Sequence, residues 1–161
     1  MPQDRVSRLV TLYEERASLE RVEGDTATQA ASWLAQTKQD LAGVRTLVEG
    51  GSYRLAFNAA YDTMRHAAEV VVQAAGGRVT SAPGGHEAVF ALADALAGDD
   101  SPQAFSGSRA GQSRLRRHSL EYISDNPVDV NKADAEEVLQ WATDAVEAAE
   151  LFLTRSPSPQ I

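Results

Sequence analysis

The sequence predicts an all-α protein, an antiparallel up-and-down bundle of five or six helices joined by short loops. Three observations support this class. Alanine is abundant and aromatic residues make up only 6% of the chain, a composition that favours helices over strands. Apolar residues recur at the i, i+3, i+4 and i+7 spacing of amphipathic helices, without the strict alternation that indicates a strand. Glycine and proline residues separate the helical segments.

The first two helices are expected at residues 2–21 and at about residues 27–49. The first has four apolar positions at helical spacing, namely Val6, Val10, Tyr13 and Ala17. Gly24 ends it, and either Asp25 or Thr26 can cap the second helix. The second helix has a broad apolar stripe that consists of Ala30, Trp33, Leu34, Leu41, Val44, Leu47 and Val48.

The third helix, at residues 53–75, has the clearest periodicity and is expected to be the most buried one. Gly50 and Gly51 end the helix before it. Because many of its apolar positions are alanine, neighbouring helices can approach it closely. These positions are Tyr53, Ala56, Phe57, Ala60, Tyr61, Met64, Ala67, Ala68, Val71, Val72 and Ala75.

Three more helices are expected in the second half of the chain. A short helix at residues 86–97 follows a glycine-rich loop, and a fifth helix at residues 110–124 follows a polar loop. The sequence Asp-Asn-Pro at residues 125–127 breaks the fifth helix. Either Asn131 or Asp134 starts the last helix, whose apolar positions are Ala135, Val138, Leu139, Ala142, Val146, Ala149 and Leu153.

The length of 161 residues suits one domain with its own hydrophobic core. Residues 1–24 are expected to form an N-terminal helical extension, and residues 25–155 the bundle. Residues 156–161, which are rich in serine and proline, are expected to be a disordered tail.

Composition excludes several classes of function. The chain has no cysteine, which rules out disulfides, thiolate zinc sites and a cysteine nucleophile. It has neither the features of a signal peptide nor an apolar stretch of about 20 residues, so we expect a cytoplasmic protein. The net charge of −8 argues against a protein that coats nucleic acid. The three histidines lack metal-ligand spacing, and no phosphate-binding glycine loop occurs, so no metal or cofactor is expected.

One segment departs from this acidic character. Residues 101–120 contain no acidic side chain, whereas the next thirty residues hold nine acids and one lysine. On the fifth helix, Arg117 and His118 follow Arg114 by three and four positions, so the three side chains share a face. Arginine suits phosphate oxygens, but it suits the carboxylates of the last helix equally well. The opposite, core-facing side is expected to carry Leu115, Ser119, Tyr122 and Ile123.

Two stretches resemble the HEPN domains of toxin–antitoxin and defence systems. The helix at residues 53–75 is similar to the alanine- and aromatic-rich core helix of that family, and the loop after it ends in Gly84-Gly85-His86, as in many members. The sequence Arg-Leu-Arg-Arg-His-Ser-Leu-Glu-Tyr, at residues 114–122, resembles the signature helix, in which an Arg, a polar residue and three further residues precede a His. The resemblance covers about residues 25–154, so it implies a HEPN-like bundle.

The resemblance also implies a function. In active members, two signature helices meet at the cleft of a homodimer, which cuts RNA without a metal ion and leaves 2′,3′-cyclic phosphate ends. Arg117 matches the signature Arg, His118 matches the polar position, and Tyr122 stands where the family has its catalytic His. We therefore expect these three residues to be catalytic. RNA binding is expected of Arg109, Arg114 and Arg116, and a nucleotidyltransferase-type antitoxin is an implied partner.

Two other interpretations remain open. Because Tyr122 replaces the catalytic His, the chain can be an inactive HEPN module that binds a partner protein, a nucleotide or RNA. Alternatively, it can be a helical scaffold whose arginines pair only with its own acids. The structural interpretation of Tyr122 is an aromatic side chain that fills the bundle. His66 and His86, near the third and fourth helices, are expected to be structural.

Overall fold

A computed structural model describes residues 2–121, 129–155 and 160–161. Within them the chain forms six α-helices and one two-stranded antiparallel sheet, so the expected all-α bundle is confirmed. None of the described helices is long and apolar enough to span a membrane. The elements are α1 (Pro2–Glu15), β1 (Leu19–Arg21), α2 (Thr26–Glu49), α3 (Tyr53–Ala74), β2 (Gly77–Val79), α4 (Gly85–Ala97), α5 (Gly107–Glu121) and α6 (Lys132–Arg155).

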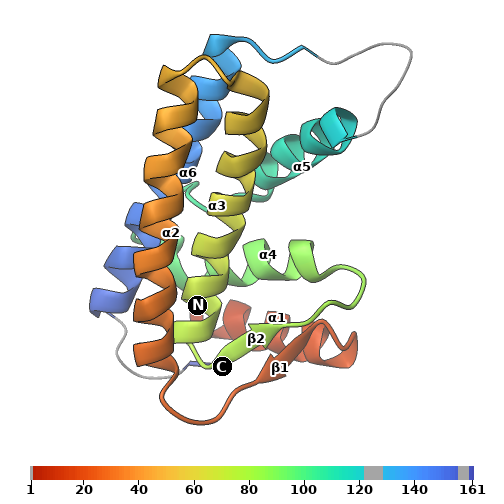
Figure 1. Cartoon of the computed structure of the whole chain (residues 1–161). Coiled ribbons are helices and arrows are strands. Elements are labelled where there is room, and N and C mark those ends of the chain that lie inside the picture. Colours follow the sequence, from red (N-terminus) through yellow and green to blue (C-terminus); the bar gives the residue numbers. More distant parts are fainter. Residues whose placement is uncertain (1, 122–128, 156–159) are drawn as a thin grey trace.

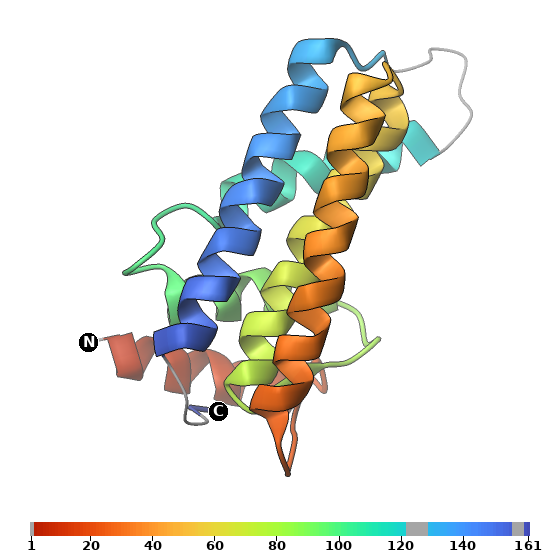
Figure 2. The ribbon, with the colours of Figure 1, turned by 60° about the vertical axis from the view of Figure 1, so that its left-hand side comes forward.

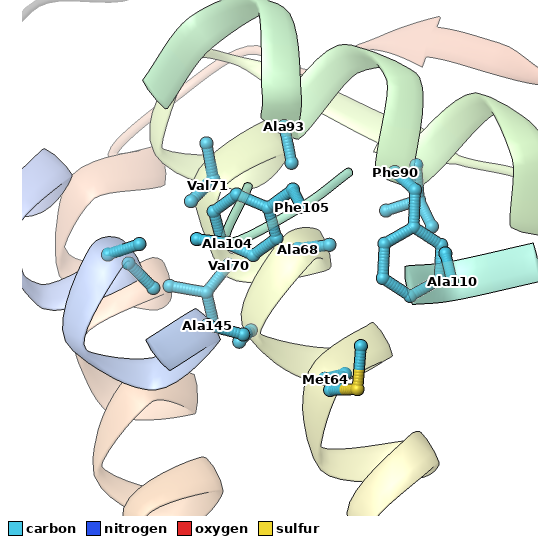
Figure 3. Packing of buried hydrophobic residues seen from close by; sticks show 14 of the residues in the cluster. Met64, Ala68, Val70, Val71, Phe90, Ala93, Ala104, Phe105, Ala110 and Ala145 are labelled. Carbon is cyan, nitrogen blue, oxygen red and sulfur yellow. The ribbon is translucent and has the colours of Figure 1, made fainter. Parts of the chain in front are cut away.

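The long helices α2, α3 and α6 lie side by side and form the main bundle (Figures 1 and 2). α3 contacts α2, α4, α5, α6 and β2, so it is the central element, as its periodicity predicts. Met64 and Ala68 of α3 are completely buried. Figure 3 shows them in the same core as Phe90 of α4, Phe105 of the α4–α5 loop and Ala145 of α6.

The first helix is shorter than expected. α1 ends at Glu15 instead of residue 21, and Ala17 turns the chain with a φ of 56°. The next residues form β1, in which Leu19 lies opposite Val79 of β2. Strand pairing joins segments that are far apart in the chain, so the local periodicity of residues 2–21 did not indicate it.

The N-terminal segment belongs to the same core as the bundle. α1 packs against α4, and it adds three side chains to the hydrophobic cluster of the long helices, namely Val6, Val10 and Tyr13. The boundary expected at residue 24 therefore does not separate two cores. At the other end, the N–H groups of Gln160 and Ile161 donate to the carbonyl oxygen of Ala75. Residues 156–159 of the expected disordered tail lie outside the described residues.

Polar side chains fix the starts of three helices. The carboxylate of Asp25 accepts a hydrogen bond from the N–H of Thr28 at 3.0 Å, at the start of α2. Ser106 accepts one at the start of α5, which begins three residues earlier than expected. Before α6, the side chains of Asn131 and Asp134 each accept from the backbone N–H of the other, at 2.9 and 3.0 Å. Both residues proposed for this helix start therefore take part in a reciprocal cap.

Candidate functional site

α5 packs on the bundle with a different face from the one expected. Leu115 is 70% exposed and Ser119 is also exposed, so the expectation that they face the core is wrong. Tyr122 and Ile123, which were expected on the same side, lie outside the described residues. The buried or half-buried positions of α5 follow a helical spacing of i, i+4, i+7, i+8 and i+11. These positions are Arg109, Ser113, Arg116, Arg117 and Leu120, and Ala110 and Gly111 beside them are also buried or half-buried.

Two of these arginines, Arg109 and Arg116, form ion pairs with acidic side chains of α6. Arg109 pairs with Asp144 at 2.8 Å, and its guanidinium lies over the ring of Trp141. Arg116 donates from both terminal nitrogens to Asp134, at 3.1 and 2.7 Å. Carboxylates and aromatic rings thus hold α5 together with the apolar side chains of Ala110 and Leu120, which belong to the hydrophobic core. The RNA-binding role expected of Arg109 and Arg116 therefore applies to side chains that already pair with acids of the same chain.

Arg117 connects α5 to α3. Its Nη1 lies 2.8 Å from Oδ1 of Asp62, and its guanidinium lies 5.2 Å from the centre of the Tyr61 ring. The same carboxylate is 3.9 Å from Arg65, which pairs with Glu69 at 2.5 Å. A row of alternating charges therefore runs along α3 and is joined by Arg117 of α5.

Six residues from three helices surround an open cavity of about 430 Å³, and we call it the His86–His118 cavity. It lies where α3, α4 and α5 meet, on the side of α3 away from α2 (Figure 1). Two of the three histidines of the chain line it. Its residues are Tyr61 from α3, His86 from α4, and Arg114, Leu115, Arg117 and His118 from α5. Arg114 is exposed and has no carboxylate partner among the described residues.

Tyr61 and His86 form a defined contact in this cavity. The Tyr61 hydroxyl lies 2.9 Å from Nδ1 of His86, and the two rings are stacked. Tyr61 is buried, while His86 is exposed at the rim. Burial lowers the pKa of His86 below its usual value, and the charges of Arg65, Arg114 and Arg117 lower it further. Burial also raises the pKa of Tyr61, so the phenol stays protonated.

The tautomer of His86 decides what this contact can do chemically. When Nδ1 carries the proton and the Tyr61 oxygen accepts it, Nε2 has a free lone pair and can act as a base. In the other neutral tautomer, the Tyr61 hydroxyl donates to Nδ1, and Nε2–H is a hydrogen-bond donor. Both forms hold the ring in one orientation at the cavity.

A second cavity, of about 390 Å³, shares Tyr61, His86 and Arg114 with the first and continues between α4 and α5. Gly107 and Gly111 line its α5 side, and a β-carbon added at either glycine would meet no atom within 4 Å. The open space beside His86 is therefore longer than the His86–His118 cavity alone.

The structure brings Arg114, Arg117 and His118 together in one cavity, as expected. Two further residues of this cavity, His86 and Tyr61, were not expected to be functional. His86 follows the sequence Gly84-Gly85, and this pair is the signal that could have identified it. Gly84 has a φ of 87°, and a β-carbon at Gly85 would lie 2.7 Å from a backbone carbonyl oxygen. The positive φ at residue 84 and the close backbone contact at residue 85 both favour glycine. The turn that these two glycines form comes directly before His86. For Tyr61, the helical spacing indicated burial only.

Comparison of the chain with models of protein families, with curated proteins and with solved structures finds no match in any of the three. Among the residues that the structure describes, no group of three or more His, Asp or Glu side chains is arranged to hold a metal ion. Tyr122 lies outside those residues, so its catalytic role stays a prediction.

Proposed function

We propose that this chain is a HEPN-type endoribonuclease of a toxin–antitoxin or defence system, with the His86–His118 cavity as its reaction centre. The observation that carries the proposal is that two histidines and two arginines from different helices line one cavity. Cleavage of RNA by its own 2′-OH needs a proton acceptor, a proton donor and positive charge near the phosphate. The Arg117–His118 pair that resembles the HEPN signature lies in the same cavity.

In the proposed reaction, Nε2 of His86 accepts the proton of the 2′-OH as the 2′-oxygen attacks the adjacent phosphorus. The bond from phosphorus to the 5′-oxygen breaks, and protonated His118 gives its proton to that oxygen. Arg114 and Arg117 stabilise the negative charge on the non-bridging oxygens. The products are a 2′,3′-cyclic phosphate and a 5′-hydroxyl. The lowered pKa of His86 supports its role as the base, because the imidazole is then neutral near pH 7.

The proposal includes a homodimer that forms through α5 and a nucleotidyltransferase-type antitoxin as partner. Leu115 supports the dimer, because this large apolar side chain is 70% exposed at the rim of the cavity. The residues of α5 that precede Leu115, from Gly107 to Arg114, contain no acidic side chain, so no negative charge of this segment would repel the same segment of a second protomer. A second protomer on this face would cover Leu115 and enclose the cavity.

The test is cleavage of total RNA and tRNA in EDTA by the wild type and by variants of the cavity. We expect His86→Gln and His118→Gln each to lower the rate by about 10²–10⁴-fold, as for loss of a general acid or base. Arg114→Ala should lower it as well. Arg155→Ala is the control, because Arg155 lies at the end of α6, outside the cavity, and pairs with Asp100 at 2.7 Å. Intact RNA, under conditions where an active HEPN nuclease cuts, would disprove the proposal.

One observation favours a second candidate, a HEPN module that binds RNA, a nucleotide or an antitoxin without cutting. Arg109, Arg116 and Arg117 each pair with a carboxylate of this chain, in a protein whose net charge is −8. Because carboxylates of the chain neutralise these three guanidinium groups, less positive charge is left to stabilise the transition state of RNA cleavage. RNA that binds but stays intact, with weaker binding by Arg114→Ala, would support this candidate. Absence of any binding would support a scaffold instead.

A further inference from the structure

Trp33 lies outside the core, although its spacing placed it in the apolar stripe of α2. Its side chain is 58% exposed, whereas the buried positions of α2 include Ala30, Leu34 and Thr37. Trp33 is one position away from this face, which is a rotation of about 100° around the helix. Tryptophan is highly buried on average in folded proteins. The exposed indole therefore offers a flat aromatic surface to a ligand.

Trp33 lines a groove whose other residues come from α2, α3, β2 and the loop before α2. Its volume is about 300 Å³, at the lower end of the range of about 300–1,000 Å³ that holds small ligands. Thr37, Val70 and Gly77 line the groove and are buried. We call it the Trp33 groove. It lies between α2 and α3, whereas the His86–His118 cavity lies where α3 meets α4 and α5.

Two side-chain amides provide hydrogen-bonding groups in this groove. Nε2 of Gln73 donates to Oε1 of Gln29 at 3.2 Å. This bond leaves the NH₂ group of one amide and the carbonyl oxygen of the other available to a ligand. If both amides turn over, the roles exchange, but the pair still presents one donor and one acceptor. A flat aromatic surface thus stands in the same groove as a donor and an acceptor.

The charges of the groove are already balanced by neighbouring side chains. Arg78 pairs with Glu20 at 2.7 Å and Glu69 with Arg65 at 2.5 Å. The groove therefore has no surplus of positive charge that would attract a phosphate group. Recognition there depends on stacking and on neutral hydrogen bonds.

We propose that the Trp33 groove binds a nucleobase, stacked on the indole, with its polar edge against the Gln29–Gln73 pair. Each base has an aromatic face for stacking, and each has donors and acceptors on one edge, which glutamine amides can match. The base can come from a free nucleoside or from an unpaired nucleotide of RNA or DNA. The groove can bind it whether or not the His86–His118 cavity cuts RNA.

The experiment uses the fluorescence of Trp33. The chain has two tryptophans, so Trp141→Phe leaves Trp33 as the only one, excited at a wavelength that tyrosine does not absorb. Circular dichroism checks that this variant is folded. The probes are adenosine, guanosine, cytidine and uridine, and unstructured oligonucleotides of the same bases. We expect saturable quenching by at least one nucleoside. No quenching by any nucleoside at millimolar concentration would overturn the proposal.

Substitution of the amides tests the chemistry of recognition. We expect Gln73→Leu and Gln29→Leu to weaken nucleoside binding about tenfold or more, whereas Gln39→Leu, on α2 outside the groove, leaves it unchanged. Calorimetry with Trp33→Leu should show no binding. If naphthalene binds as tightly as the nucleosides and the Gln variants bind nucleosides normally, the groove is only apolar and the proposal fails.

The two sources of the base are distinguished by the same titration. Much tighter binding of oligonucleotides than of nucleosides, with the same dependence on Gln73, identifies an unpaired base of a nucleic acid. Binding of nucleosides alone identifies a free nucleoside. Oligonucleotide binding that is independent of Trp33 and Gln73 would show that the phosphates bind elsewhere, and it would contradict a base site in this groove.

Discussion

The hydroxyl group of Tyr61 and Nδ1 of His86 lie 2.9 Å apart, and they join α3 to α4 across 25 positions of the chain. A buried phenol thereby orients an imidazole whose other edge is exposed. Both side chains line the cavity that also contains Arg114, Arg117 and His118 of α5. The first predictions below follow from the electrostatics of this contact.

Removal of a positive charge should raise the pKa of His86. Arg114 is one of the cations that disfavour the protonated imidazole, so Arg114→Ala should move the pKa towards the usual value of about 6.5. An NMR titration of the imidazole resonances measures this change. Arg78→Ala, on β2, is the control and should leave the pKa in place. Identical titration curves for the wild type and Arg114→Ala would refute the prediction.

The stability of the protein should depend on the protonation of His86. The folded-state pKa is lowered, so below about pH 6.5 the unfolded chain binds more protons at this residue than the folded chain does. The free energy of unfolding should therefore fall as the pH drops from 6.5 through the folded-state pKa. Urea unfolding at pH 7.5, 6.5 and 5.5 should show a steeper fall for the wild type than for His86→Gln. Parallel pH profiles would contradict this.

The ion pair between Arg117 and Asp62 should contribute to holding α5 on α3. Both side chains are partly buried, so a double-mutant cycle with Arg117→Ala and Asp62→Ala should give a coupling free energy of about 1 kcal/mol. The exposed pair of Arg8 and Asp4, within α1, is the reference and should give less than about 0.5 kcal/mol. Equal couplings for the two pairs would show that the α5 pair has no special role.

Two large apolar residues near α5 should differ in their contribution to stability. Phe105 is 1% exposed and fills the core beside α3 (Figure 3), so Phe105→Ala should cost about 3–5 kcal/mol in the free energy of unfolding. Leu115 is 70% exposed, and Leu115→Ala should change it by less than about 0.5 kcal/mol. Urea denaturation measures both values. A large loss for Leu115→Ala would contradict the packing of α5 described above.

The proposed dimer makes Leu115 important for association instead of for folding. Leu115→Glu should convert a dimer into a monomer, because it places a charge where the second protomer covers an apolar surface. Sedimentation velocity at several protein concentrations measures this. Trp33→Glu is the matched control, since Trp33 is 58% exposed on α2 and lies outside both α5 and the His86–His118 cavity. A wild type that stays monomeric at every concentration would disprove the dimer through α5.

Local sequence signals located most of the helices and their ends. The start of α2 at Asp25 and the start of α6 at Asn131 and Asp134 follow from side chains that bond to N–H groups three residues away or less. The periodicity of α3 identified the central helix, because a helix with apolar residues around most of its circumference must be covered by several neighbours.

Local signals failed where the choice of face was decided by distant partners. In α5, Leu115 is exposed while Arg116 and Arg117 are half-buried, because Asp134 and Asp62 neutralise these two guanidinium groups. In α2, Trp33 has the hydrophobicity of a core residue, but the helix turns it to a groove at the surface.

The sequence by itself determined the helical class, the central position of α3 and the gathering of positive charge on α5, because these depend on residues within a few positions of one another. Only the tertiary structure decided that β1 pairs with β2, that α5 faces the bundle with its arginines, and that Tyr61 and His86 share a cavity with Arg117 and His118. These relationships join residues that are 18 or more positions apart, and neither helical spacing nor composition contains information on how such segments pack.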